Sequence, residues 1–394
     1  MKRQRFGALD GWRGVCALLV AQFHLSANSH VYALPIVRNA WLFVDFFFVL
    51  SGFVISHAYC NRLGDSRAFG SFVIRRFGRL WPLHVAVLAA MVGLEFVDLA
   101  FVSTTGIGAI RTPFSGRSTV PAIFTNLLLI HSLAIHRSTT WNSPSWSIST
   151  EFYTYIVFAL IYIATRRFWS SAVLPLAIAV AAGIAVFVLA GTMDTTVDFG
   201  FFRCVCGFFV GHVTYRIWSA GQSLRFGRQW WLAEISSIVA AAVFVSFVGS
   251  GPSSIAAPLV FAVVVWVFAQ DGGPVAKLMN TLPLASLGAW SYSIYMVHSL
   301  VLRVMTGASD VVTKLTGTAL TGEIAIPSLS NPVALYNFGN KWVMDGLTLA
   351  YLATVVALSS LTYAWIETPA RHYFNARASR LKGPNRGEAP EPQP

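Results

Sequence analysis

The chain has 394 residues, of which 55% are apolar and 11% are charged, and its mean hydropathy is +0.62. Soluble domains average about 25% charged residues, so this composition excludes an ordinary soluble protein and indicates an integral membrane protein. The net charge of +12 can come from basic loops that face anionic lipid, and it gives no reason to infer nucleic-acid binding. The four cysteines lack the spacing of a disulfide or a zinc site, so we expect packing residues and no bound metal.

Apolar stretches long enough to cross a hydrocarbon core of about 30 Å predict an all-α fold with about ten transmembrane helices. The predicted spans are 12–30, 40–59, 80–101, 147–165, 172–191, 199–218, 231–249, 253–270, 284–306 and 343–366. With both termini cytoplasmic, the inner segments carry twenty lysines and arginines and the outer segments six, in accord with the positive-inside rule. The apolar segment 121–136 would reverse this bias if it crossed the membrane, so we predict that it is re-entrant or interfacial.

The domain organisation predicted from the sequence is one membrane domain over residues 1–372. A basic and then Pro-rich tail follows over residues 373–394, and we expect it to be disordered. No internal repeat is evident, and the first span is too long for a cleavable signal peptide. Gly207 and Gly211 have the spacing of a helix-packing face. Glu367 and Arg371 are expected to pair where the last span ends.

His24 is the first residue of chemical interest, and Arg13 precedes it near the inner start of the same span. At a rise of about 1.5 Å per residue, His24 lies roughly 18 Å into the membrane, slightly beyond the midplane. An ionisable group at that depth needs a partner or a function. The imidazole could form an interhelical hydrogen bond, act as a general base, or carry an acyl group. We favour the base or the acyl carrier.

Asp45 is a lone carboxylate among aromatic residues, about 8 Å below the outer face on the same helical arithmetic. An isolated carboxylate there would take up a proton, so we expect Asp45 to be paired either with His24 or with an arginine. As the partner of His24 it would fix the tautomer of the imidazole. The neighbouring Phe46, Phe47 and Phe48 could line a short acyl pocket or face lipid, and facing lipid is the simpler prediction.

Arg75, Arg76 and Arg79 form a basic cluster before the third span, which Pro82 opens. Arg75 and Arg79 are four residues apart and share one helix face. The cluster could be an ordinary positive-inside anchor. Alternatively, because planar guanidinium groups bind phosphate in a bidentate manner, it could hold the phosphates of a cytosolic donor.

The fourth span opens with Trp146 to Glu151. Ser147 suits a helix start, where its hydroxyl can cap backbone N–H groups. Glu151 lies about 6 Å below the outer face, which is too deep for a simple cap. We therefore predict that Glu151 acts in acid–base chemistry or positions an acceptor.

Tyr292, Tyr295 and His298 lie on the ninth predicted span. The tyrosines offer hydroxyl groups, although tyrosines near a membrane surface commonly belong to the aromatic belt. His298 lies about 21 Å from the inner start of its span. By depth, four groups from four helices are expected to gather in the outer half of the membrane, as in bundle sites. These groups are His24, Asp45, Glu151 and His298.

Taken together, five segments in chain order resemble the motifs of the acyltransferase 3 family, over about residues 5 to 372. Each segment alone is a weak signal, but five in order at compatible positions form a specific pattern. The segments are Leu9-Asp10-Gly11-Trp12-Arg13-Gly14 with His24, Asp45 to Phe53, Arg75-Arg76-x-x-Arg79-x-x-Pro82, Trp146-Ser147-Ile148-x-x-Glu151 and Tyr292-x-x-Tyr295-x-x-His298.

The resemblance implies a multi-span enzyme of the bacterial cytoplasmic membrane that moves an acyl group, most often acetyl, from acyl-CoA to a hydroxyl of a glycan or lipid-linked glycan. It also implies that His24 and the three arginines take part in activity. We therefore predict catalytic residues His24, Asp45 and Glu151, with donor phosphates bound by Arg75, Arg76 and Arg79. Acceptor or supporting residues are predicted at Arg13, Ser147, Tyr292, Tyr295 and His298.

One departure from the family pattern concerns the tryptophan segment. Many members have a second acid where this chain has Phe152, and only Tyr155 of a Phe-Tyr pair is kept, so Glu151 is the remaining acidic candidate. The alternative function is a multi-span transporter or flippase for a small polar or lipid-linked substrate. Transporters often have repeated halves, which this sequence lacks.

Overall fold

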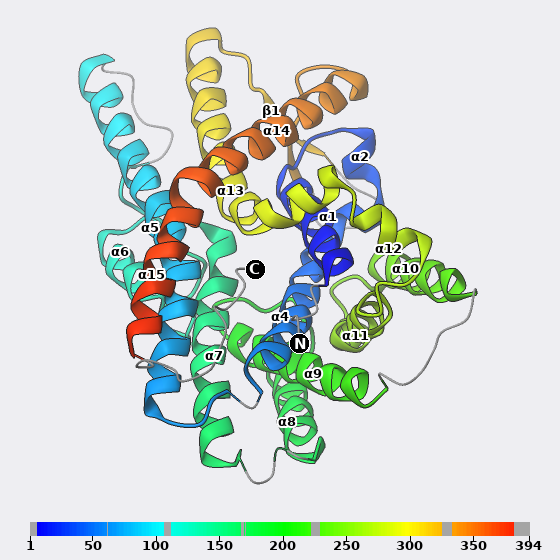
Figure 1. The fold of residues 1–394 in the computed structure, drawn as a ribbon. Helices are drawn as coiled ribbons and strands as arrows, with labels where there is room; N and C mark the ends of the chain where they lie inside the picture. Colours follow the sequence, from blue (N-terminus) through cyan, green and yellow to red (C-terminus); the bar gives the residue numbers. More distant parts are fainter. Residues whose placement is uncertain are drawn as a thin grey trace.

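The computed structural model describes residues 6–60, 62–105, 112–166, 169, 171–221, 229–324 and 333–381. It is a helical bundle with one small β-hairpin (Figure 1). The α-helices are α1 Gly7–His24, α2 His30–Ala33, α3 Pro35–Arg38, α4 Phe43–Tyr59, α5 Ser66–Thr105, α6 Val120–Leu127, α7 Trp146–Ala164, α8 Val173–Ala190, α9 Gly200–Ala220, α10 Trp230–Val248, α11 Ala257–Phe268, α12 Pro274–Met279, α13 Leu282–Thr316, α14 Lys341–Thr362 and α15 Thr368–Leu381. Short 3-10 turns are η1 Ala40–Leu42, η2 Ser143–Ser145 and η4 Pro252–Ala256, and a π-helical turn, η5 Tyr363–Glu367, joins α14 to α15.

Every predicted span falls on a helix, and six helical segments of the described chain are long and apolar enough to cross a membrane. These are Ala40–Tyr59, Ser66–Thr104, Ser143–Ala164, Val173–Ala190, Trp230–Val248 and Lys341–Leu381. The apolar helix Pro252–Phe268 is shorter. The remaining predicted spans coincide with α1, α9 and α13, which are interior helices with buried polar residues such as Arg203 and His298. A multi-pass membrane protein follows from this arrangement.

Three details differ from the sequence-based expectation. The fold is not purely helical, because β1 Thr321–Ile324 and β2 Val333–Tyr336 pair antiparallel, and Tyr336 also bridges to Ala27. The segment 121–136 begins with the eight-residue helix α6 and continues without regular structure, and its place in the membrane stays a prediction. Residues 373–381, expected to be disordered, form the end of α15; the residues beyond 381 lie outside the described chain.

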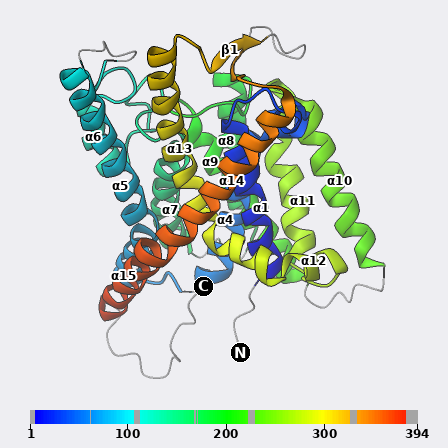
Figure 2. The same ribbon diagram turned by 90° about the horizontal axis from the view of Figure 1, so that it is seen from above.

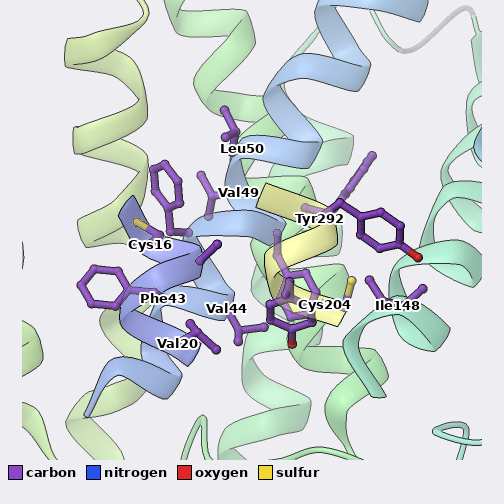
Figure 3. Packing of buried hydrophobic residues seen from close by; sticks show 14 of the residues in the cluster. Cys16, Val20, Phe43, Val44, Val49, Leu50, Ile148, Cys204 and Tyr292 are labelled. Carbon is purple, nitrogen blue, oxygen red and sulfur yellow. The ribbon is translucent and has the colours of Figure 1, made fainter. Parts of the chain in front are cut away.

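The described N-terminal end of α1 and the C-terminal end of α15 lie at one end of the bundle, and the hairpin lies at the other (Figure 2). Buried side chains from α1, α4, α7, α9 and α13 form the centre of the core (Figure 3). All four cysteines are free thiols, and Cys16, Cys204 and Cys206 are buried, which confirms that they pack in the core.

Glycines allow two pairs of core helices to approach closely. A Cβ atom added to Gly288 of α13 would overlap the backbone of Asp10 in α1, and one added to Gly14 would meet the backbone of Leu287. On α9, an added Cβ at Gly211 would overlap the carbonyl oxygen of Val49 in α4, so the predicted packing role of this glycine is confirmed. Small residues at such crossings are the usual basis of helix packing in membranes.

We expect Gly288→Ala to destabilise the protein by about 1–3 kcal/mol, because the added methyl group must push α1 away from α13. The matched control is Gly346→Ala in α14, where an added Cβ meets no atom within 4 Å and helix propensity improves. Thermal unfolding of the purified variants in detergent measures both effects. Equal midpoints for Gly288→Ala and Gly346→Ala would contradict the close α1–α13 contact.

Candidate active site

A cavity of about 990 Å³ opens between α1, α4, α5, α7, α13 and α15. Most of the residues singled out in the sequence lie on its wall. They are Arg13, Arg75, Arg76, Arg79, Ser147, Glu151, Tyr292 and Tyr295. His24, Asp45 and His298 are not part of the lining.

The charges on this wall are unbalanced. Five arginines line the cavity, whereas its carboxylates are Asp10 and Glu151. The arginines are Arg13, Arg75, Arg76, Arg79 and Arg371. A cavity with a surplus of cationic groups and partly apolar walls concentrates anionic ligands. Since guanidinium groups match phosphate oxygens in a bidentate manner, phosphates are the best-fitting anions.

One end of the cavity is formed by the packing of α15 against α5. Arg75 donates a hydrogen bond from Nη2 to Oγ of Ser379, 3.0 Å away. Gly78 lies against the Phe374 side chain, and any larger residue there would separate the two helices. Arg371 forms the expected ion pair with Glu367 at 3.6 Å, and it also lines the cavity, which the sequence did not predict.

Arg76 and Arg79 differ in how they are held. Nη2 of Arg76 donates to the hydroxyl of Tyr59 at 3.2 Å, and its guanidinium carbon lies 5.4 Å from the Tyr59 ring and 6.0 Å from the Tyr155 ring. Arg79 forms no hydrogen bond or ion pair with any residue of the described chain. Its charge acts on Glu367 from a longer distance, and its N–H groups are left to donate to a ligand in the cavity.

Glu151 faces the same space as the arginines. The Tyr155 hydroxyl donates to Oε1 of Glu151 at 2.5 Å, and that hydroxyl also lies 2.7 Å from Oγ of Ser51. From the sequence, the arginines were predicted at the inner face and Glu151 in the outer half of the membrane. In the structure, the arginines and Glu151 line the same cavity. Helix α5 begins at Ser66, so that Arg75 and Arg79 lie about 14 and 20 Å along it.

Helix α13 connects the parts of the site. Its Ser291 accepts a hydrogen bond from Nη2 of Arg13 at 3.0 Å, and Tyr292 donates to the backbone carbonyl of Leu80 in α5. One turn further along, Tyr295 accepts a hydrogen bond from Ser147 at 2.8 Å and donates to the carbonyl of Pro144 at 3.0 Å. The tyrosine hydroxyls thus brace α13 against α5 and the start of α7.

His24 and His298 form an adjacent pair, with ring centroids 4.9 Å apart. Nδ1 of His24 lies 2.9 Å from the carbonyl oxygen of Val20, and Nδ1 of His298 lies 3.1 Å from that of Ile294. Because a carbonyl oxygen can only accept, each neutral ring carries its hydrogen on Nδ1 and keeps the lone pair on Nε2. Nε2 of His298 is buried and has no hydrogen-bond partner. In both rings the lone pair is therefore on Nε2.

The histidine pair lies one side chain beyond the cavity. The ring of Tyr295, which lines the cavity, is 5.9 Å from that of His298. His24 is the last residue of α1, whereas the predicted span continued to residue 30, and it is half-buried, whereas His298 is fully buried. Arg13 and His24 are eleven residues apart on nearly the same face of α1, a separation of about 16 Å along the helix.

Asp45 does not contact His24, so the predicted role of orienting the imidazole is wrong. The other predicted partner, an arginine, is confirmed: Nε and Nη2 of Arg203 donate to the two carboxylate oxygens of Asp45, at 3.0 and 2.7 Å. The Arg203 guanidinium lies between the rings of Trp41 and Trp146. The pair is buried between α4 and α9, away from the cavity lining.

Arg203 is the main residue that the prediction of the site left out. An arginine inside a predicted span was the available signal, because such a charge requires a partner. In the cavity itself, the residues that the prediction left out include Ser51, Tyr59, Tyr155 and Arg371. Their contribution depends on tertiary packing, and no local pattern indicates it.

Comparison with known proteins identifies the family. A family model described as an acyltransferase domain matches residues 6–366. This chain belongs to the acyltransferase 3 family. It is therefore a membrane acyltransferase, and family membership favours the enzyme over the transporter alternative.

Two curated relatives align with the chain, one over part of it and the other over nearly all of it. It is 26% identical to acyltransferase MdmB of Streptomyces mycarofaciens, over 98% of this chain and 97% of that protein. It is 32% identical to protein 2 in the picA locus of Rhizobium radiobacter, over 40% of this chain and 82% of that protein. No solved structure matches the chain.

We expect Arg203→Met to destabilise the acyltransferase by about 3–5 kcal/mol, because it leaves Asp45 buried without its partner. The double variant Asp45→Asn with Arg203→Met removes both charges and should recover much of this loss. Thermal unfolding in detergent measures the two changes. The single variant Asp45→Asn completes the comparison. If its destabilisation simply adds to that of Arg203→Met in the double variant, the two residues are not coupled.

Proposed function

We propose that the acyltransferase moves a short acyl group from cytosolic acyl-CoA to a hydroxyl of a glycan or lipid-linked glycan. The observation that carries this proposal is the arginine-lined cavity, whose opposite end adjoins the His24–His298 pair. An elongated donor with phosphates at one end and a thioester at the other fits such a cavity. The phosphates would bind Arg75, Arg76 and Arg79, with Arg13 and Arg371 nearby.

In the proposed reaction, Nε2 of His24 takes the proton of the acceptor hydroxyl as the oxygen attacks the thioester carbonyl carbon. The new C–O bond forms, the C–S bond breaks, and the proton passes to the departing thiolate to give free CoA. No redox step or added reagent is needed. The hydrogen bond from Nδ1 to Val20 keeps Nε2 in the form that can accept the proton. An acyl-His24 intermediate would require attack by Nε2 itself and predicts a labelled protein.

Access from two sides is part of this proposal. The arginine wall includes α15, which lies at the end of the bundle where α1 begins (Figure 2). The excess of basic residues in the predicted inner segments supports assigning this end to the cytoplasm of a bacterial inner membrane. His24 lies at the other end of α1 and is half-buried, so an acceptor could approach it without entering the donor cavity.

Glu151 receives a narrower role than the sequence suggested. It faces the cavity among the arginines and accepts the Tyr155 hydrogen bond, so we assign it to positioning Tyr155 and Arg76. Asp45, paired with Arg203, supports the fold and not the proton transfer. His298 is the neighbour of His24 and the better candidate for a second proton-accepting group.

Replacing His24 with Ala should lower CoA release by at least about 100-fold, the usual loss when a general base is removed. Purified protein in nanodiscs with radiolabelled acetyl-CoA gives the rate, and thermal unfolding checks the fold. The matched control is His30→Gln, which alters an exposed histidine paired with Asp345. A fully active His24→Ala protein would rule out the mechanism. Label retained on the wild type but not on His24→Ala would favour an acyl-enzyme.

Replacing Arg79 with Gln should raise the KM for acyl-CoA more than it lowers kcat, because the residue is assigned to donor phosphates and not to proton transfer. Loss of one charge-assisted contact corresponds to a KM increase of about 10-fold or more. The matched control is Arg380→Gln, an exposed arginine of α15 outside the cavity. Equal donor dependence in both variants would mean that Arg79 is only a membrane anchor.

A further inference from the structure

The cavity follows one stripe of α4. Its lining residues on that helix recur at one or two positions in each turn, from Val44 to Tyr59. These residues are Val44, Phe47, Phe48, Leu50, Ser51, Val54, Ile55, Ala58 and Tyr59. From Val44 to Tyr59 the helix advances by fifteen residues, so the cavity lining extends about 22 Å along α4.

The two ends of this stripe differ in chemistry. Tyr59 receives the hydrogen bond of Arg76, so its end of the stripe belongs to the arginine wall. At the other end, the wall is formed by Val44 and Phe47 of α4 with Ile148 of α7 and Tyr295 of α13. Val44 and Ile148 come from neighbouring helices in the centre of the core (Figure 3). Three of these four side chains are apolar, and the fourth, Tyr295, has its hydroxyl already bonded to Ser147 and to Pro144, so this end is apolar.

The apolar end is also the end nearest to the histidines. The Tyr295 ring lies 5.9 Å from the Phe47 ring on one side and 5.9 Å from the His298 ring on the other. A thioester carbonyl beside Tyr295 would therefore place its acyl tail against Phe47. The expectation that the phenylalanines of this span face lipid is wrong, because Phe47 and Phe48 line the cavity and Phe46 is buried.

Phe47 has little room to move away from such a tail. Its ring packs edge-on against Phe46, with centroids 6.0 Å apart, and Phe46 packs in turn against Phe261 of α11. Tyr295 on the opposite wall is fixed through its hydroxyl. A pocket closed by rings that are supported from behind limits the length of what enters, since a packed core resists added methylene groups.

We propose that the end of the cavity formed by Val44, Phe47, Ile148 and Tyr295 is the acyl pocket, and that Phe47 sets the longest acyl chain the enzyme accepts. This inference rests on the proposed function, because it takes the ligand of the arginine wall to be acyl-CoA. The pocket takes a short aliphatic chain joined to a thioester. One methylene more or less in such a pocket changes specificity by about 10–200-fold.

The test compares acetyl-, butyryl-, hexanoyl- and octanoyl-CoA on purified protein in nanodiscs. Two readouts are taken for each donor: displacement of labelled CoA, which reports binding without an acceptor, and release of CoA, which reports reaction. The variants are Phe47→Ala and the milder Phe47→Leu, which retains an apolar side chain if the first does not fold. Phe187→Leu in α8 is the matched control, because Phe187 is exposed and lies outside the lining.

We expect the wild type and Phe187→Leu to favour the shortest donors. Phe47→Ala and Phe47→Leu should raise the kcat/KM ratio of hexanoyl- to acetyl-CoA by about 10-fold or more, with unacylated CoA bound as tightly as by the wild type. If the Phe47 variants bind CoA but keep the wild-type order of chain lengths, the acyl pocket is wrong and the proposed function stands. If the wild type binds no acyl-CoA at all, the proposed function fails and the acyl pocket fails with it.

Discussion

The close parallel packing of α1 against α13 is the contact on which the site depends. Gly14 and Gly288 leave no room for side chains between the two backbones, so the helices are held in one register. That register brings Arg13 to Ser291 near the arginine wall and His24 to His298 at the far end. The two residues of α1 that the proposal assigns to donor binding and to proton transfer are thereby kept about 16 Å apart.

Two arginines inside the helical bundle differ in whether the fold supplies them with hydrogen-bond partners. Arg203 is fully satisfied by Asp45 and by backbone carbonyls, so it stabilises the packing of α9 on α4 and has nothing left to offer a ligand. Arg79 has no such partner in the described chain and faces an open cavity. Its charge acts on Glu367 across the bundle, and its free N–H groups agree with the proposed role of binding an anionic donor.

Much of this arrangement could be predicted from the sequence, but the ends of the helices could not. The apolar stretches located the long helices, and motif spacing named eight residues of the cavity wall, from Arg13 to Tyr295, whereas α2, α3, α12 and α15 were not predicted. The ends were misplaced because each helix was taken to start where its apolar stretch starts. Helix α5 begins fourteen residues before that point, and α1 ends at His24 and not six residues later.

The partner of Asp45 shows a different limit of sequence reasoning. Charge balance alone allowed either His24 or an arginine, and the choice depends on how α9 packs against α4. Glycines at positions 52, 207 and 211 bring those helices together, and the contact sets Arg203 opposite Asp45. Local patterns identify which groups need partners, whereas tertiary packing decides which partner each one receives.

The separation of the two ends of the cavity bears on how the reaction is kept specific. In the proposed reaction, the donor phosphates bind at the arginine end, which includes α5 and α15, whereas the histidines lie beyond Tyr295 at the other. A thioester would then reach the histidines only if its carrier is long enough to span the stripe along α4. Binding energy from the remote phosphates would thereby position the reacting carbonyl, and a short thioester without them would lack that anchor. In this proposal His24 would be kept away from the solvent at the arginine end, which would favour transfer to the acceptor over hydrolysis of the donor.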